Sequence, residues 1–143
     1  MLQVWTPPYL LNGKPRPTIE NAPKTLSYNK TFSFGFSGVS AVDRVVINRV
    51  ISATHGNHFD QRQVVLDCSP GSSSTIACAG PPNSSVAPPG QYMLFAVASG
   101  VPSVAPYVSL QTKAFDIKSD LVDHLGLEGV KHLADEALGG FTG

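Results

Sequence analysis

The stretch SATHGNHFDQR, residues 52–62, holds the side chains best suited to chemistry in this chain. It contains two of the four histidines, His55 and His58. Imidazole is a good ligand for transition metals, but a metal site needs several ligands. The His-x-x-His spacing, with no helix and no third ligand, is a weak metal signal. The stretch alone therefore does not predict a complete metal site, and the isolated chain is not expected to bind a metal tightly.

Motifs for nucleophilic or phosphate chemistry are absent from the sequence. No Gly-x-Ser-x-Gly occurs, and GSSSTIACAG lacks the lysine and the strand-to-helix context of a phosphate-binding loop. The chain has 10 Lys+Arg and 10 Asp+Glu residues. This balance gives no electrostatic reason to expect a nucleic acid or an anionic membrane as partner.

Several features indicate a secreted, extracellular protein. Cys68 and Cys78 flank the turn-rich segment SPGSSSTIA, which favours a disulfide over two free buried thiols. N-glycosylation sequons begin at Asn29 and Asn83. No leader and no apolar run long enough to span a membrane is visible. Either a leader has been removed, or the chain is the downstream part of a longer protein.

The 143 residues fit one domain, and the pattern through residue 112 is that of β-strands separated by Gly, Pro and Ser turns. Phe32, Phe34 and Phe36 alternate, as on a half-buried strand. TIAC reads as a short edge strand, and GQYMLFAVAS as a central strand covered on both faces. The six predicted strands are KTFSFGF, VDRVVINRVIS, RQVVLD, TIAC, GQYMLFAVAS and PYVSLQT. Residues 1–112 therefore predict an all-β, immunoglobulin-like antiparallel sandwich.

Tyr92 follows the turn PPG and opens the predicted central strand. Its hydroxyl could bond back to the backbone of that turn, as in a tyrosine corner, or the ring could simply fill the core. Both readings stay open at this point.

Residues 113–143 change character, with apolar side chains at helical spacing. They predict an amphipathic helical tail, interrupted at Gly126 and Gly129. The tail would pack on the sandwich or on a neighbouring domain, or join two copies into a homodimer. His124 and His132 are expected to be surface residues.

Four blocks carry a resemblance to a known family. They are VWTPPYLLNGKPRP, SATHGNHFDQR, VAPPGQYMLFAV and GVPSVAPYVSL, and they follow the family's order between residues 3 and 112. The chain resembles the C-terminal immunoglobulin-like, or early-set, domain of the galactose oxidase and glyoxal oxidase family, the copper radical oxidases. The tail from Lys113 lies outside the resemblance.

The resemblance implies a role for the histidine stretch. In that family a loop of this domain reaches into a catalytic β-propeller and supplies one histidine ligand to copper, which corresponds to His55 here. Thr54 and Gly56 flank that ligand, while Asp60 and Arg62 are expected to pair or to bond the loop backbone. The family oxidises alcohols or aldehydes and reduces oxygen to hydrogen peroxide. Copper is implied only for the full oxidase, and this chain alone is expected to be non-catalytic and free of cofactor.

A second hypothesis is a free-standing secreted module that binds a glycan or a cell-surface protein, with a lectin-like or immunomodulatory role. Met1, just before the N-terminal lead-in VWTPPYLLNGKPRP, and the additional tail favour it. A third reading is a domain that only stabilises its neighbours, and the sequence does not separate it from the oxidase domain.

Overall fold

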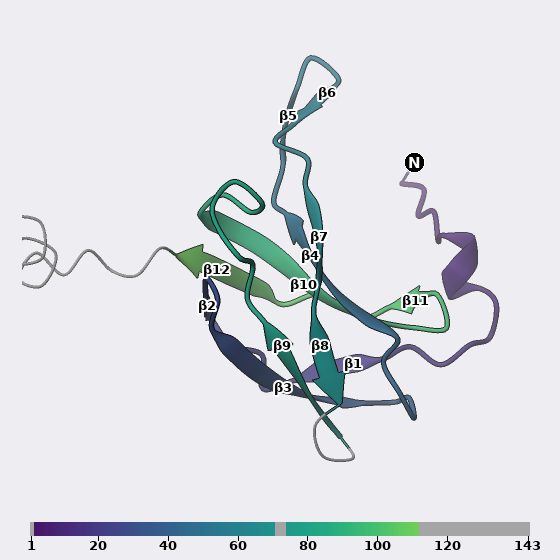
Figure 1. Cartoon of the computed structure of the whole chain (residues 1–143). Helices are drawn as coiled ribbons and strands as arrows, with labels where there is room; N and C mark the ends of the chain where they lie inside the picture. Colours follow the sequence, from purple (N-terminus) through teal and green to yellow (C-terminus); the bar gives the residue numbers. More distant parts are fainter. Residues whose placement is uncertain (1, 71–73, 112–143) are drawn as a thin grey trace, which may run out of the picture. The chain divides into compact units, whose positions relative to one another are not determined.

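The computed structural model describes residues 2–70 and 74–111, which hold one short 3₁₀ turn and twelve strands (Figure 1). The elements are η1 (Pro8–Leu10), β1 (Thr18–Glu20), β2 (Thr25–Ser27), β3 (Thr31–Ser37), β4 (Arg44–Arg49), β5 (Ser52–Thr54), β6 (Asn57–Phe59), β7 (Gln63–Leu66), β8 (Cys68–Pro70), β9 (Thr75–Ala79), β10 (Gly90–Ala98), β11 (Val101–Pro102) and β12 (Tyr107–Gln111). The predicted helical tail, with His124 and His132, lies outside the described residues.

The prediction of an all-β sandwich is confirmed. The six predicted segments correspond to β3, β4, β7, β9, β10 and β12, while the remaining strands are only two or three residues long. No helix in these described ranges is long and apolar enough to cross a membrane.

Two sheets face each other across the core. One has the strand order β1-β3-β9-β8, and the other has the order β2-β12-β10-β4-β7, with β11 paired to β10. The prediction that TIAC forms an edge strand is wrong, because β9 lies between β3 and β8. Most pairs are antiparallel as predicted, but β2 runs parallel to β12.

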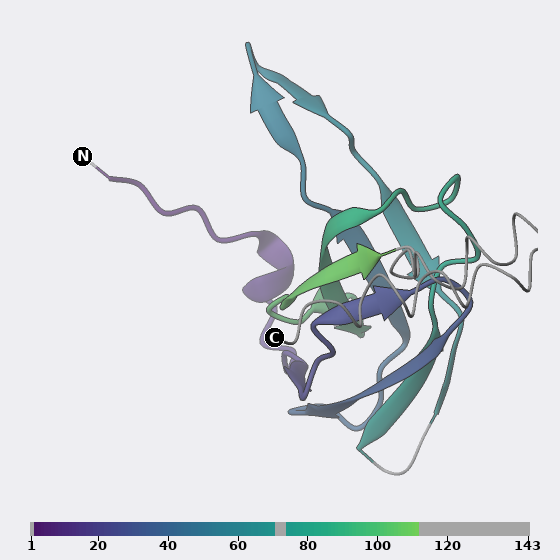
Figure 2. The ribbon, with the colours of Figure 1, turned by 90° about the vertical axis from the view of Figure 1, so that its left-hand side faces the viewer.

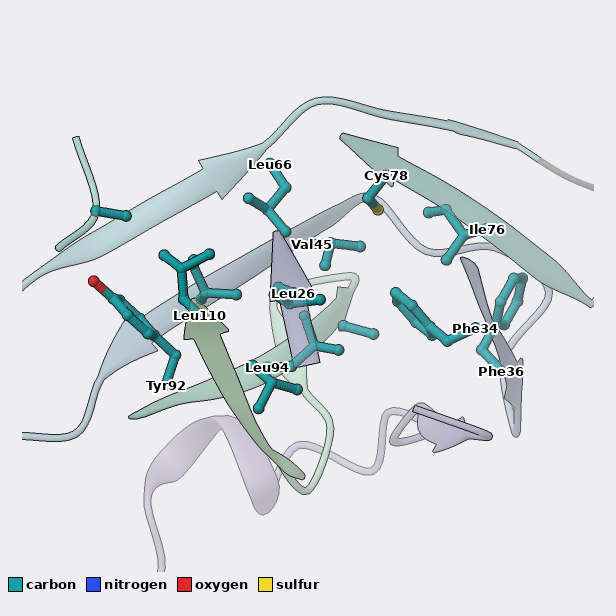
Figure 3. Packing of buried hydrophobic residues seen from close by; sticks show 14 residues of the cluster. Leu26, Phe34, Phe36, Val45, Leu66, Ile76, Cys78, Tyr92, Leu94 and Leu110 are labelled. Atoms are coloured by element: carbon teal, nitrogen blue, oxygen red, sulfur yellow. The ribbon is translucent and has the colours of Figure 1, made fainter. Parts of the chain in front are cut away.

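Alternation along the strands builds the core between the sheets (Figure 3). Phe34 and Phe36 of β3 point inward from one sheet, and Tyr92 and Leu94 of β10 point inward from the other. β10 is central, as predicted, but it is buried on both faces only at its end, over residues 96–98. Over residues 92–95 it alternates between buried and half-buried side chains.

The predicted disulfide is present. Cys68 on β8 and Cys78 on β9 are direct cross-strand partners, and their sulfur atoms are 2.04 Å apart. Cys78 is fully buried and belongs to the core cluster. The bridge thus joins the strand β8, at the end of its sheet, to the packed interior.

Candidate functional site

The histidine stretch forms a β-hairpin that stands away from both sheets (Figures 1 and 2). Strands β5 and β6 pair only with each other, and Thr54 lies opposite Asn57. His55 and Gly56 are the two turn residues, with φ angles of 54° and 78°. Positive φ at both positions defines a type I′ turn, whose twist matches that of the flanking strands. The fold therefore places the imidazole at the tip of a projecting arm.

His55 is exposed and contacts the side chain before it. The Thr54 hydroxyl oxygen lies 2.8 Å from Nδ1 of His55. In the tautomer in which Nδ1 donates this hydrogen bond, Nε2 presents its lone pair to the outside, which is the form that binds a metal. Thr54 can therefore fix both the tautomer and the ring orientation.

Gly56 is required by the backbone of the turn. A Cβ placed on it would meet no atom within 4 Å, so a side chain here would cause no steric clash. Glycine is required because the backbone φ angle is 78°, a conformation that residues with a side chain rarely adopt. His58 lies on β6 opposite Ala53 and is also exposed.

The root of the hairpin is held by two arginines. Asp60 and Arg62 do not pair with each other. Asp60 instead accepts a hydrogen bond from Nε of Arg49, with 2.8 Å between Nε and Oδ2. Arg62 donates to the carbonyl oxygens of Ser85 and Val86, at 2.7 and 2.8 Å. The limb that follows β6 is thus tied down at two points, to Arg49 at the end of β4 and to the segment that precedes β10.

Arg49 has further partners on the sandwich. Its Nη1 donates to the carbonyl oxygen of Pro89 at 2.8 Å, and its guanidinium carbon lies 5.2 Å from the centre of the Tyr92 ring. The hydrogen bond to Asp60 is the main cause that raises the pKa of Arg49 above its ordinary value. The guanidinium is therefore a fixed positive charge at the base of the hairpin.

Tyr92 is both a core residue and a tyrosine corner, so the two sequence readings are compatible. Its ring is fully buried, and its hydroxyl donates to the carbonyl oxygen of Pro88 at 2.7 Å. Tyr28 makes a similar bond to the Ala87 carbonyl oxygen at 2.6 Å. Burial raises the pKa of both tyrosines, and the nearby charge of Arg49 partly opposes this.

The two predicted glycosylation sites also lie on the surface. Asn29 and Asn83, the sequon asparagines, are exposed. Nδ2 of Asn29 donates to the Pro82 carbonyl oxygen, whereas Asn83 uses Oδ1 to accept the backbone N–H groups of Ser85 and Val86. Over residues 2–70 and 74–111, no group of three or more His, Cys, Asp or Glu side chains could hold a metal ion.

Two residues of the site were not predicted from the sequence, Arg49 and Gly90. Arg49 is the last residue of the apolar strand β4, and a charged side chain next to a buried strand usually has a partner. This position was the signal in the sequence. Gly90 has a φ of 138°, and a Cβ there would lie only 2.8 Å from Cζ of Arg49. The glycine in PPGQY therefore signals a point where another group approaches the backbone closely, as well as a turn.

A family model described as "Galactose oxidase-like, Early set domain" matches residues 16–110. The chain belongs to this family. This galactose oxidase-like early-set domain is related to the copper radical oxidases, as the resemblance implied.

Relatives of the early-set chain include several oxidases. It is 35% identical over 119 residues to the aldehyde oxidase GLOX of Vitis pseudoreticulata, covering 76% of this chain and 23% of that protein. It is 34% identical over 108 residues to the galactose oxidase of Gibberella zeae, covering 72% and 16%. A WSC domain-containing protein of Arthroderma benhamiae is 35% identical over 112 residues, with 76% and 12% covered.

A solved structure supports the same relationship. It is a fungal alcohol oxidase of the AA5 family in complex with copper, and it superposes with a TM-score of 0.67 at 30% identity. The match covers 75% of this chain and 24% of that one. The early-set chain therefore spans between about an eighth and a quarter of the length of these relatives.

Proposed function

We propose that this chain is the non-catalytic early-set domain of a secreted copper radical oxidase, and that it presents His55 to copper held mainly by a β-propeller domain. The observation that carries the proposal is the projecting hairpin, with an exposed imidazole in its two-residue turn. A side chain at such a tip is poorly placed for a site within its own sandwich. It is well placed to enter a site on a neighbouring domain.

The ligand count supports a shared site. The hairpin tip offers one imidazole, and the described part of the chain offers no group of three metal-binding side chains. Copper bound by nitrogen and oxygen donors needs several ligands, so the others would come from outside this domain. The residues present thus fit one ligand of a copper centre, and they do not fit a complete one.

The surface around the hairpin root supports burial against a partner. Val50, Ile51 and Phe59 are large apolar residues, and they are 38%, 42% and 49% exposed. Apolar side chains exposed at the root of a projecting polar hairpin are typical of a surface that docks on another protein surface. Exposed apolar side chains also mark the lead-in before β1, where Trp5 is 88% exposed. A propeller packed against the hairpin would cover the apolar side chains at its root.

In the assembled oxidase, bound copper would accept one electron and a tyrosine of the propeller crosslinked to a cysteine would accept the other, so that an alcohol or aldehyde is oxidised by two electrons and oxygen is reduced to hydrogen peroxide. The residues of this chain would bind the metal and orient its imidazole ligand. His55 would donate Nε2 to the metal, and Thr54 would hold the imidazole through Nδ1. Gly56 would allow the tight turn that brings the ring to the tip.

Two features of the chain favour secretion. The disulfide between Cys68 and Cys78 suits an oxidising compartment. Asn29 and Asn83 lie on the surface, where a glycosylating enzyme can reach a sequon. Intact mass of the secreted product, before and after enzymatic removal of N-glycans, tests both asparagines.

The test of the proposed function is a domain exchange. Residues 1–112 replace the early-set domain of the copper-bound fungal alcohol oxidase, and copper content and peroxide production are measured. We expect His55→Ala to abolish both, and His58→Ala to leave both close to the unsubstituted chimera. His58 is the matched control because it is an exposed histidine on the same hairpin. Equal behaviour of the two variants in an active chimera would contradict the proposal and favour a free-standing binding module.

A further inference from the structure

We infer that Arg49 is a positioning residue for His55, because its guanidinium fixes the direction in which the hairpin leaves the sandwich. The claim about hairpin direction stands on the structure of this chain. Only the consequence for copper rests on the proposed function.

The hairpin needs such a device because the β-ladder does not set its angle. β5 and β6 form a sheet of their own, separate from the two sheets of the sandwich. The last backbone ties at its root are Arg49 N–H to the Arg62 carbonyl oxygen at 2.8 Å, and Val50 N–H to the Gln91 carbonyl oxygen at 3.1 Å. Beyond this point an arm of about ten residues must be oriented by side chains.

One half of the Arg49 guanidinium is fixed to the sandwich. Nη1 donates to the carbonyl oxygens of Pro89 at 2.8 Å and of Pro88 at 3.4 Å. The group also lies over the Tyr92 ring, whose own hydroxyl is bonded to Pro88. The Arg49 side chain is only 17% exposed, so its position is determined by packing as well as by hydrogen bonds.

The other half of the guanidinium holds the hairpin. Nε donates to Oδ2 of Asp60, the residue that follows β6. Asp60 has a φ of 60°, so the chain turns there as it comes back to the sandwich. Because the guanidinium is planar and rigid, a fixed Nη1 also fixes the direction of Nε. Arg49 therefore links the limb of the hairpin that follows β6 to the carbonyl groups of the turn before β10.

Gly90 makes this arrangement possible. A side chain there would occupy the space of the guanidinium, because even a Cβ would approach Nη1, Cζ and Nη2 too closely. Arg62 adds a second tie from the same limb to the carbonyl oxygens of Ser85 and Val86. The segment before β10 thus acts as a platform for both arginines.

A small change of angle at the root would move the tip considerably. His55 is five residues from Asp60, which corresponds to about 16 Å along a strand. A pivot of about 15° over that length displaces the imidazole by about 4 Å, whereas metal–ligand distances vary by only about 0.2 Å. The main effect of losing Arg49 would therefore be on the orientation of the hairpin and the position of the His55 imidazole.

The same contact contributes little to folding. Asp60 has a side chain that is 47% exposed, and ion pairs exposed to this degree are screened by water. The pair is thus expected to govern the direction of the hairpin without governing the stability of the sandwich, and the experiment separates these two effects.

The first experiment uses NMR on the unsubstituted chain and on Asp60→Asn, Arg49→Lys and His58→Ala. We expect high backbone order parameters for residues 54–57 in the unsubstituted chain, near about 0.85, and values below about 0.6 in Asp60→Asn and Arg49→Lys. Residual dipolar couplings of these amides should cease to fit the alignment of β4 and β10. His58→Ala should match the unsubstituted chain, and Asp60→Glu should restore much of the order.

Three outcomes would overturn the inference. The first is a tip that is already disordered in the unsubstituted chain, and the second is a tip unchanged by Asp60→Asn and Arg49→Lys. The third is equal loss of order in the hairpin and in β4 and β10, which would show a general structural role instead.

A second measurement connects the inference to copper. In the domain-exchanged oxidase, Asp60→Asn should weaken copper binding by about ten- to a hundredfold, as for partners that orient a metal ligand. Loss of hairpin order without any effect of His55→Ala on copper would leave the positioning role intact and refute the proposed function. If instead His55→Ala loses copper while Asp60→Asn and Arg49→Lys leave the order of the hairpin unchanged, the proposed function is supported and the positioning role of Arg49 is refuted.

Discussion

The tyrosine corner provides the most direct quantitative prediction from this structure. Tyr92→Phe removes one buried hydroxyl and keeps the ring in the core. The lost hydrogen bond joins that hydroxyl to the Pro88 carbonyl oxygen across 2.7 Å. The ring itself is fully buried, so the substitution changes the polar contact and leaves the packing of the ring nearly unchanged.

The expected cost follows from the partners that remain. A neutral hydrogen bond of this kind contributes about 0.5–1.5 kcal/mol net, and a buried carbonyl left without a partner adds to the loss. The Pro88 carbonyl oxygen keeps a long contact to Nη1 of Arg49 at 3.4 Å, which offsets a part of that second cost. We therefore expect Tyr92→Phe to lower the free energy of unfolding by about 1–1.5 kcal/mol. In a domain of this size the Tm falls by roughly 4–8 °C.

The assay is urea denaturation, with the midpoint compared at an unchanged m value. Tyr107→Phe is the matched control, since the Tyr107 side chain is 66% exposed. It should change the free energy of unfolding by less than about 0.5 kcal/mol. If the two phenylalanine variants unfold at the same urea concentration, the corner hydrogen bond contributes nothing and the reasoning fails.

Three further predictions concern pH, Gly90 and the disulfide. Burial raises the pKa of Tyr28 and Tyr92, so the folded state holds these protons more tightly than the unfolded state. Their contribution to stability is therefore complete below about pH 10 and is lost as pH rises through the folded-state pKa values. Urea midpoints measured from pH 8 to 11 should fall less steeply in Tyr92→Phe, and an identical slope would count against this. Gly90→Ala should lower the free energy of unfolding by about 1–3 kcal/mol through strain and displacement of Arg49. It should cost more than Gly100→Ala, where φ is also positive but a Cβ meets nothing within 4 Å, and a smaller loss would show that crowding is absent. Reduction of the Cys68–Cys78 bridge, with a sequence separation of 10, should lower the urea-derived free energy of unfolding by about 2.7 kcal/mol on the chain-entropy estimate. Coincident curves for the oxidised and reduced chain would refute that value.

Local patterns predicted the long strands well. Phe34 and Phe36 are buried as their alternation required, and β10 lies at the centre of its sheet as its apolar run indicated. Strand order was harder, because it depends on contacts between distant segments. The segment TIAC is short and looked like an edge, yet β9 receives β3 on one side and β8 on the other.

The site was predicted in part. The sequence pointed to the histidine stretch and to Tyr92, whose hydroxyl does bond back to the turn before β10. It did not reveal a hairpin, because all residues of β5 and β6 are exposed and leave no pattern of alternating burial. It also missed Arg49 as the partner of Asp60, since the two are brought together by the fold across a separation of 11 residues.

The central claim is that His55 of this domain binds copper on another domain. Residues 1–112 contain only two histidines, His55 and His58, which makes isotope labelling decisive. This domain, labelled with ¹⁵N-histidine, is joined to an unlabelled propeller of the copper-bound alcohol oxidase. Pulsed electron paramagnetic resonance then detects the nitrogen nuclei coupled to Cu(II). Our account predicts a ¹⁵N imidazole coupling that persists in His58→Ala and disappears in His55→Ala. A copper spectrum from the assembled protein with ¹⁴N couplings alone would contradict it.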